Sequence, residues 1–206
     1  YQVNLFAAEP MLANPIHMMW DSSGRLWVAC SWAYPQLKPG EKANDKIIIL
    51  EDTDDDGNAD KSTVFADGLY LPTGIELANG GCYVAQSPDV FFFKDTDGDD
   101  VADVKEVALT GFGIEDSHHS ISAWRRGPGG WIYFQEGIFL HTQVETQYGV
   151  VRNFNGGVYQ YNPRTQELKM FVRGTGGNPW GHVFDRWGQS FMVNNPRIIY
   201  LSPGSG

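Results

Sequence analysis

Two short acidic segments carry the residue types and the spacing of a cation site. The segment DTDDDGNAD spans residues 52–60, and DTDGDDVAD repeats the pattern 43 residues further along, at 95–103. Calcium prefers six to eight oxygen ligands, which alternating aspartates and a backbone carbonyl can supply around one ion. The alternative to a cation site is an acidic hairpin loop that is simply solvated. Two loops with the same spacing of aspartates argue against this alternative, because carboxylates this close repel one another unless a cation lies between them.

We therefore predict one structural calcium ion in each loop. The predicted ligands are Asp52, Asp54, Asp56, the Asn58 carbonyl and Asp60 in the first loop, and Asp95, Asp97, Asp99, the Val101 carbonyl, Asp103 and Glu106 in the second. The second loop should bind more tightly, because its twelfth residue is Glu106, whereas the first loop has Thr63 there. The flanking segments are typical of strands, so we expect hairpin loops and no helical EF-hand pair.

A pair of histidines provides the second candidate site. His118 and His119 lie in the segment DSHHS at residues 116–120. A neutral imidazole can take up a proton near neutral pH, which suits a general base, although two histidines can equally serve as hydrogen-bonding groups between sheets. Asn178, which precedes a proline as Asn14 does, falls at a comparable place in its own repeat. Further residues that could join this site are Arg125, Glu136, His141 and His182.

The elements that position these residues form a repeat of short strands. Four glycines, at positions 24, 80, 130 and 188, each precede an aromatic residue by three, and they are separated by 56, 50 and 58 residues. Such periods, with short strands and Gly- or Pro-containing turns, are typical of β-propeller blades of four antiparallel strands. We predict an all-β propeller with blades at about 14–69, 70–113, 118–174 and 178–201, and an insertion at 137–155 in the third.

The last repeat has only three predicted strands, whereas residues 1–6 alternate as a lone strand does. A propeller commonly protects its edges by pairing a strand from one end of the chain with the blade at the other. We expect residues 1–6 to pair with 197–201 if the ring closes within this chain as a single domain. Otherwise the chain is a piece of a larger ring, such as one of six blades.

Composition excludes several classes of function. The net charge of −10 argues against a nucleic-acid partner, because phosphate binding needs a basic face. The sequence contains no run of 18 apolar residues, so we expect no transmembrane segment. Cys30 and Cys82 are the only cysteines, which excludes a CxxC redox pair, and burial is a better expectation for them than a disulfide.

Four long segments resemble one known family. IILEDTDDDGNADKSTVFADGL, DSHHSISAWRRGPGGWIYFQEGIF, QVETQYGVVRNFNGGVYQYNPRT and NPWGHVFDRWGQ are similar to the PVC-type membrane-bound dehydrogenases. That family is distantly similar to soluble glucose/sorbosone dehydrogenases, six-bladed propellers that use pyrroloquinoline quinone (PQQ). The resemblance implies PQQ as cofactor, a sugar or alcohol substrate, and a cytochrome c domain or protein as electron acceptor.

The same resemblance assigns roles to individual residues. His119 falls where those enzymes keep the base that removes the hydroxyl proton, and Asn178 falls where an asparagine contacts the cofactor. The match is incomplete, since Gly177 stands where an arginine is expected and Leu69 stands near the place of a glutamine.

Three hypotheses for the function follow. The first is a quinone-dependent dehydrogenase domain, and the second is a non-catalytic, calcium-stabilised propeller that binds carbohydrate or protein. The third is a lactonase or other hydrolase with an ion held by Glu136, Asn178 and a histidine. We expect this chain alone to be inactive as a dehydrogenase, and we expect a periplasmic or extracellular location at the cell surface.

Overall fold

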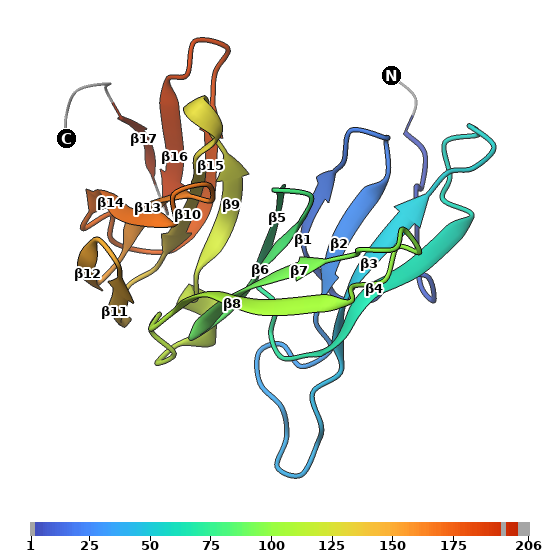
Figure 1. Ribbon diagram of the computed structural model, residues 1–206, viewed down its shortest axis with the longest axis horizontal. Helices are drawn as coiled ribbons and strands as arrows, with labels where there is room; N and C mark the ends of the chain where they lie inside the picture. Colours follow the sequence, from blue (N-terminus) through green and yellow to red (C-terminus); the bar gives the residue numbers. More distant parts are fainter. Residues whose placement is uncertain (1–2, 195–196, 202–206) are drawn as a thin grey trace. The chain divides into compact units, whose positions relative to one another are not determined.

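The computed structural model describes residues 3–194 and 197–201, and almost all regular structure in them is antiparallel β-sheet (Figure 1). The first sheet has the order β1-β2-β3-β4 and the second β5-β6-β7-β8. Their strands are β1 (Pro15–Trp20), β2 (Leu26–Cys30), β3 (Asp45–Glu51), β4 (Lys61–Leu69), β5 (Gly74–Ala78), β6 (Gly81–Gln86), β7 (Asp89–Lys94) and β8 (Val104–Thr110).

The second half of the chain forms two further blades and a separate hairpin. The third sheet has the order β14-β13-β10-β9, the fourth β15-β16-β17, and β11-β12 pair with each other. Their strands are β9 (Ser122–Arg126), β10 (Ile132–Glu136), β11 (His141–Thr146), β12 (Gly149–Phe154), β13 (Gly157–Asn162), β14 (Glu167–Arg173), β15 (Pro179–Phe184), β16 (Ser190–Asn194) and β17 (Arg197–Leu201). Short 3₁₀ turns, η1 (Ser117–His119) and η2 (Pro128–Gly130), flank β9.

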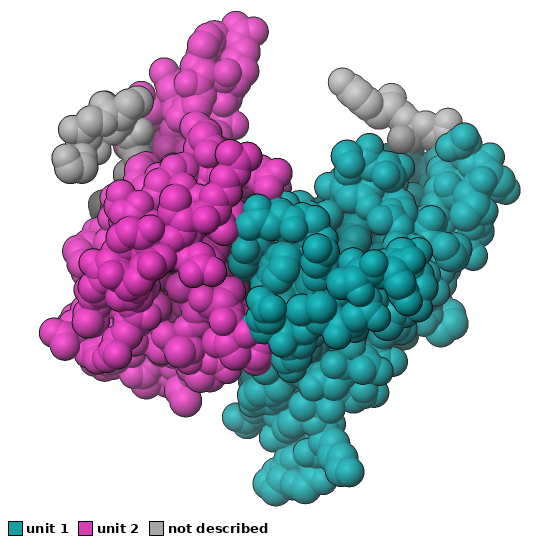
Figure 2. All heavy atoms as spheres, in the orientation of Figure 1, with its two compact units in different colours: residues 1–86, 92–106 teal, residues 87–91, 107–206 magenta. Residues whose placement is uncertain are grey.

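The chain divides into two compact units (Figure 2). Unit 1 contains residues 1–86 and 92–106, and unit 2 contains residues 87–91 and 107–206, so β7 and β8 contribute residues to both units. Each unit has its own core. Leu26, Val28, Cys30, Ile48 and Leu50 cluster in unit 1, whereas in unit 2 the rings of Trp124 and Phe134 stack with centroids 4.3 Å apart.

The first turn of every blade has the same backbone conformation. The four repeated glycines have φ angles of 81° (Gly24), 73° (Gly80), 78° (Gly130) and 80° (Gly188). Only glycine adopts this left-handed region without a steric penalty, which explains why the sequence repeats it. The aromatic residue three positions later lies on the second strand of its hairpin in each case. The all-β, four-bladed propeller class predicted from this repeat is confirmed.

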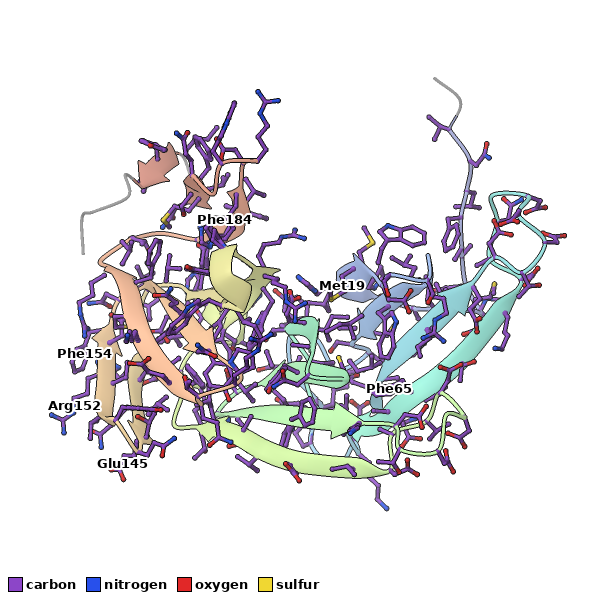
Figure 3. The ribbon with its side chains drawn as sticks, turned by 45° about the horizontal axis from the view of Figure 1, so that its top comes forward. Met19, Phe65, Glu145, Arg152, Phe154 and Phe184 are labelled. Carbon is purple, nitrogen blue, oxygen red and sulfur yellow. The ribbon has the colours of Figure 1, made fainter. Side chains whose placement is uncertain are left out.

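The predicted insertion in the third blade is an ordered hairpin. β11 and β12 pair from His141↔Phe154 to Thr146↔Gly149, and Thr142 and Val144 on β11 face inward. The labelled side chains Glu145 and Arg152 lie on the solvent side of this hairpin (Figure 3), where both are exposed. The alternation of buried and exposed residues along HTQVET was the signal for a strand that our sequence analysis missed.

The prediction of a strand at residues 1–6 is wrong for residues 3–6, which are the part of it that the structure describes. Residues 3–6 belong to no strand, and residues 1 and 2 lie outside the described residues. The Phe6 carbonyl instead accepts a hydrogen bond from Ala59 N at 2.7 Å, and Phe6 packs against the core of unit 1. A single alternating hexapeptide cannot specify its partner, and here the first acidic loop provides the contact.

Both cysteines are buried and free, as expected. Burial raises the pKa of the Cys30 and Cys82 thiols, which keeps both in the unreactive thiol form. Within the described ranges, no helix is long and apolar enough to cross a membrane.

Candidate functional site

The two acidic loops gather carboxylates in the same way. The carboxylate groups of Asp52, Asp54 and Asp56 each offer an oxygen, and these oxygens lie within 4.8 Å of one another. Asp95, Asp97 and Asp99 form the equivalent group in the second loop. Both groups lie in unit 1, between the third and fourth strands of their blades.

Backbone conformation explains why both loops curl so tightly. The fourth residue of each loop is left-handed, with φ of 62° at Asp55 and 86° at Gly98, and so is the sixth, with φ of 90° at Gly57 and 66° at Asp100. Asp100 therefore adopts the conformation that glycine provides in the first loop, which aspartate tolerates better than most residues. Its carboxylate also bonds to the Arg25 guanidinium at 2.7 Å, an ion pair that helps to fix the loop.

The ninth residue of each loop closes the hairpin from within. The Asp60 carboxylate accepts a hydrogen bond from Thr53 Oγ1 at 2.8 Å, and Asp103 Oδ2 accepts one from Thr96 Oγ1 at 2.8 Å. Asn58 N and Val101 N donate to Asp56 and Asp99, so these two residues lie directly beside the clusters.

Three of the predicted carboxylate ligands, Asp60, Asp103 and Glu106, are not members of either cluster. Asp60 and Asp103 bond to the threonine at the second position of their own loops, whereas Glu106 lies on β8 and is exposed. The two loops therefore present the same three carboxylates, and the predicted advantage of the second loop has no support in this geometry.

The carboxylates within each loop repel one another. The Asp56 carboxylate raises the pKa of Asp54, and the carboxylates of Asp99 and Asp103 raise the pKa of Asp97. Backbone N–H groups, with Gly98 first, lower the pKa of Asp95. A bound divalent cation would remove the repulsion, and the oxygen donor set is the one calcium prefers, so the residues present fit a calcium ion.

The histidine site lies in unit 2 and is held from three sides. His119 is buried, its Nε2 lies 2.5 Å from Asn178 Oδ1, and its Nδ1 lies 3.2 Å from Asp116 Oδ2. The Asp116 contact is close but not aligned as a hydrogen bond, since Nδ1 has no bonded partner. A Cβ on Gly137 would lie 2.7 Å from the His119 ring, so glycine is required for the ring to sit here.

Proton placement follows from these partners. Burial opposes ionisation of Asp116, but the hydrogen bond from His118 N and the nearby imidazoles lower its pKa, so it stays a carboxylate. Asn178 Oδ1 can only accept a hydrogen bond, so Nε2 carries the hydrogen in this contact. Nε2 presents a lone pair when the Asn178 amide is turned so that its N–H faces the ring and the hydrogen is on Nδ1, facing Asp116. Nε2 is then the atom that could accept a proton. Our sequence analysis named Asp116 but assigned it no role.

The other residues named for this site do not join it. His141 pairs with Glu115 at 2.9 Å, whereas His182 lies in the core with Nε2 2.6 Å from Ser190 Oγ. Glu136 is fully buried, where it accepts hydrogen bonds from Thr142 Oγ1 and Asn153 Nδ2, and burial raises its pKa. Both Glu136 carboxylate oxygens are therefore bonded to side chains other than Asn178 and the histidines that the lactonase hypothesis named as its partners.

Two of the positions expected to hold the quinone provide no polar side chain that could bind it. Gly177 has no side chain, and Leu69 is fully buried in its blade. Neither can bind a carboxylate of PQQ, so Asn178 is the one predicted contact that remains in place. The described residues do not fit the quinone at these positions.

Comparison with solved structures shows similarity of fold. A gluconolactonase from Xanthomonas campestris has a TM-score of 0.60 at 17% identity, with 96% of this chain and 59% of that chain covered. A putative 6-phosphogluconolactonase from Bacteroides uniformis gives 0.56 at 13% identity, covering 95% of this chain and 55% of that one. The PQQ domain of pyranose dehydrogenase from Coprinopsis cinerea gives 0.53 at 12% identity, covering 92% and 48%.

This chain therefore spans between 48% and 59% of the length of those three proteins. A search of curated proteins found no match. Residues 1–201 match the family model described as "Domain of unknown function (DUF7133)", and the chain belongs to that family.

Proposed function

We propose that this chain is a calcium-binding β-propeller domain that acts on sugars or alcohols, with His119 as the residue that takes up the hydroxyl proton. The observation that carries the proposal is the position of buried His119 between the exposed Asn178 and the half-buried Asp116. It leaves Nε2 free to accept a proton once a substrate hydroxyl displaces the Asn178 amide. Asp116 would then stabilise the imidazolium that forms.

The resemblance to PQQ-dependent dehydrogenases supports an oxidation, and the PQQ domain among the similar structures is compatible with it. In the enzymes that these segments resemble, PQQ supplies the hydride-accepting chemistry, and a cytochrome c domain or protein takes the electrons onward. Because Gly177 and Leu69 provide no contact, we assign no step of this chain to the quinone. Membership of the PVC-type group, a single propeller domain and a cell-surface location remain predictions.

The test is a dye-linked assay with an aldose, calcium and PQQ, performed on His119→Ala, His118→Ala and the unchanged protein. Loss of a general base costs about 10²- to 10⁴-fold in turnover, and we expect this for His119→Ala in whatever form of the protein is active. His118 has a half-exposed side chain and serves as the control, with little effect expected. Equal turnover in the His119→Ala variant and the unchanged protein would remove His119 as the base.

The second candidate is a non-catalytic propeller that binds carbohydrate or protein. The missing quinone contacts at Gly177 and Leu69 favour it. Saccharide binding by calorimetry, without turnover in any combination of calcium, PQQ and dye, would identify this function in place of oxidation.

A further inference from the structure

A cavity in unit 1 is lined by none of the residues of the acidic loops or of the histidine site. The loop that joins β2 to β3, residues 31–44, extends from the ends of these strands (Figure 1) and borders a half-open space of about 470 Å³. This volume is within the range of roughly 300–1,000 Å³ for small-molecule sites. The lining residues are Trp32, Ala33, Leu37, Glu41, Lys42, Asn44, Asp45 and Lys46.

The base of this cavity is fixed by one buried carboxylate. Asp45 Oδ2 accepts hydrogen bonds from Ser31 Oγ at 2.7 Å and Leu71 N at 2.8 Å, and Oδ1 accepts one from Ala33 N at 3.0 Å. These bonds tie the start of the loop to its end and to the chain that follows β4. The cavity is therefore built on a positioned frame, and the charge of Asp45 already has its partners.

The charged groups of the lining balance, with two carboxylates (Glu41 and Asp45) and two ammonium groups (Lys42 and Lys46). Glu41 Oε2 accepts a hydrogen bond from Lys38 N at 3.0 Å, so the second lining carboxylate also has a donor within the loop. Lys42 and Lys46 form no ion pair within the described ranges of the chain. These two ammonium groups can therefore bind a carboxylate of a ligand, while Glu41 can accept hydrogen bonds from its hydroxyl groups.

Trp32 forms an aromatic wall of the cavity and indicates which kind of anionic ligand would fit. The Trp32 side chain is 49% exposed, and Lys46 Nζ lies 5.7 Å from the centre of its ring. A ligand that presents an apolar face next to an anionic group can contact the indole and the ammonium together. Glu41 and Asn44 add acceptors and a donor for hydroxyl groups, which a purely aromatic or aliphatic acid would leave unused.

We propose that this cavity binds an acidic sugar. The pyranose ring would pack its C–H face on Trp32, its carboxylate would bind Lys42 and Lys46, and its hydroxyls would meet Glu41 and Asn44. The proposal does not depend on the proton-transfer role of His119, which lies in unit 2.

Calorimetric titration of the 206-residue chain at low salt tests the proposal, with D-glucuronate as the probe. We expect D-glucuronate to bind at least tenfold more tightly than D-glucose or acetate, and we expect 0.5 M NaCl to weaken its binding. The double variant Lys42→Gln/Lys46→Gln and the variant Trp32→Ala should each lose at least tenfold in affinity. Lys38→Gln, in the same loop but outside the cavity lining, should bind as the unchanged protein does.

Each other result overturns the proposal in a specific way. Equal binding of D-glucose would indicate a neutral-sugar site, and equal binding of acetate would indicate a simple anion site. No heat with any probe, or unchanged affinity in the double lysine variant, would exclude an acidic-sugar site here. The lysine substitutions change exposed or half-exposed side chains, and a thermal melt verifies that these variants fold.

Discussion

At the scale of single residues, neighbouring groups decide which of five histidines could take part in chemistry. His119 contacts an amide and lies close to a carboxylate, whereas His182 is enclosed by aromatic rings, with Tyr133 and Phe184 at centroid distances of 5.4 Å and 4.6 Å. Both are buried. The sequence alone could not separate them, because one partner of each, Asn178 for His119 and Tyr133 for His182, lies far away in the chain.

The environment of His182 leads to a prediction about stability. Burial lowers its pKa to about 4, from an ordinary value of 6.5, so the unfolded chain binds more protons between these two pH values. The stability contributed by neutral His182 is fully present above pH 6.5 and is lost as the pH falls toward 4. The loss at pH 4 is about 3 kcal/mol, since one pKa unit corresponds to 1.36 kcal/mol.

Comparison of His182→Phe with the unchanged protein tests this prediction. Thermal melts between pH 4 and 7 should show a shallower decline of Tm for the variant, which has no proton to bind at this position. Parallel curves for the two proteins would mean that His182 does not titrate differently on unfolding.

At the scale of the acidic loops, we expect the carboxylates to destabilise their hairpins without calcium and to stabilise them when calcium is bound. Without calcium, Asp54→Asn or Asp97→Asn removes a charge from a repelling cluster, so Tm should rise. With calcium, the same substitutions remove a ligand, and affinity should fall by about tenfold or more, similarly in the two loops.

Glu106→Gln is the matched control for these variants, because Glu106 is exposed and lies outside the cluster. We expect its calcium affinity to equal that of the unchanged protein within twofold. A large loss in Glu106→Gln, as the twelfth-ligand hypothesis predicted, would show that the loop rearranges around the ion.

At the scale of the strand ends, two glycines equivalent in the repeat have different surroundings. A Cβ on Gly111, at φ 110°, would lie 2.0 Å from the Gln143 carbonyl, whereas a Cβ on Gly68, at φ 64°, would meet nothing within 4 Å. Gly111→Ala must therefore displace the β11–β12 hairpin, and we expect a loss of at least ~3 kcal/mol. Gly68→Ala should cost about 1–2 kcal/mol, for its backbone conformation alone.

Chemical denaturation of the two alanine variants measures this difference. An equal loss in both would mean that the hairpin yields to the added methyl group, and that its contact with Gly111 contributes little to stability.

At the scale of the whole molecule, both acidic loops belong to unit 1. Removal of calcium with EGTA should therefore raise amide hydrogen exchange in residues 46–66 and 90–106, where released carboxylates repel one another. Exchange in β9, β10 and β13 of unit 2 should remain unchanged. Identical exchange with and without calcium in both units would contradict a structural role for the ion.

The sequence by itself determined the blade repeat and the acidic loops, because both rest on local rules. A left-handed turn needs glycine whatever surrounds it, and closely spaced aspartates on one tight loop meet without help from distant residues. Asp100 adopts the same left-handed conformation as Gly57 in the first loop, although its ion pair with Arg25, 75 residues away, is a contact that only the tertiary structure provides.

Only the tertiary structure decided what depends on segments far apart in the chain. Asn178 meets His119 across 59 positions, Asp45 meets Leu71 across 26, and the hairpin at 141–154 approaches Gly111. Such contacts depend on packing and register, which no pattern within one strand specifies. The same reason explains why Glu106 falls outside its predicted cluster, and why residues 3–6 form no strand while the Phe6 carbonyl bonds to the first acidic loop.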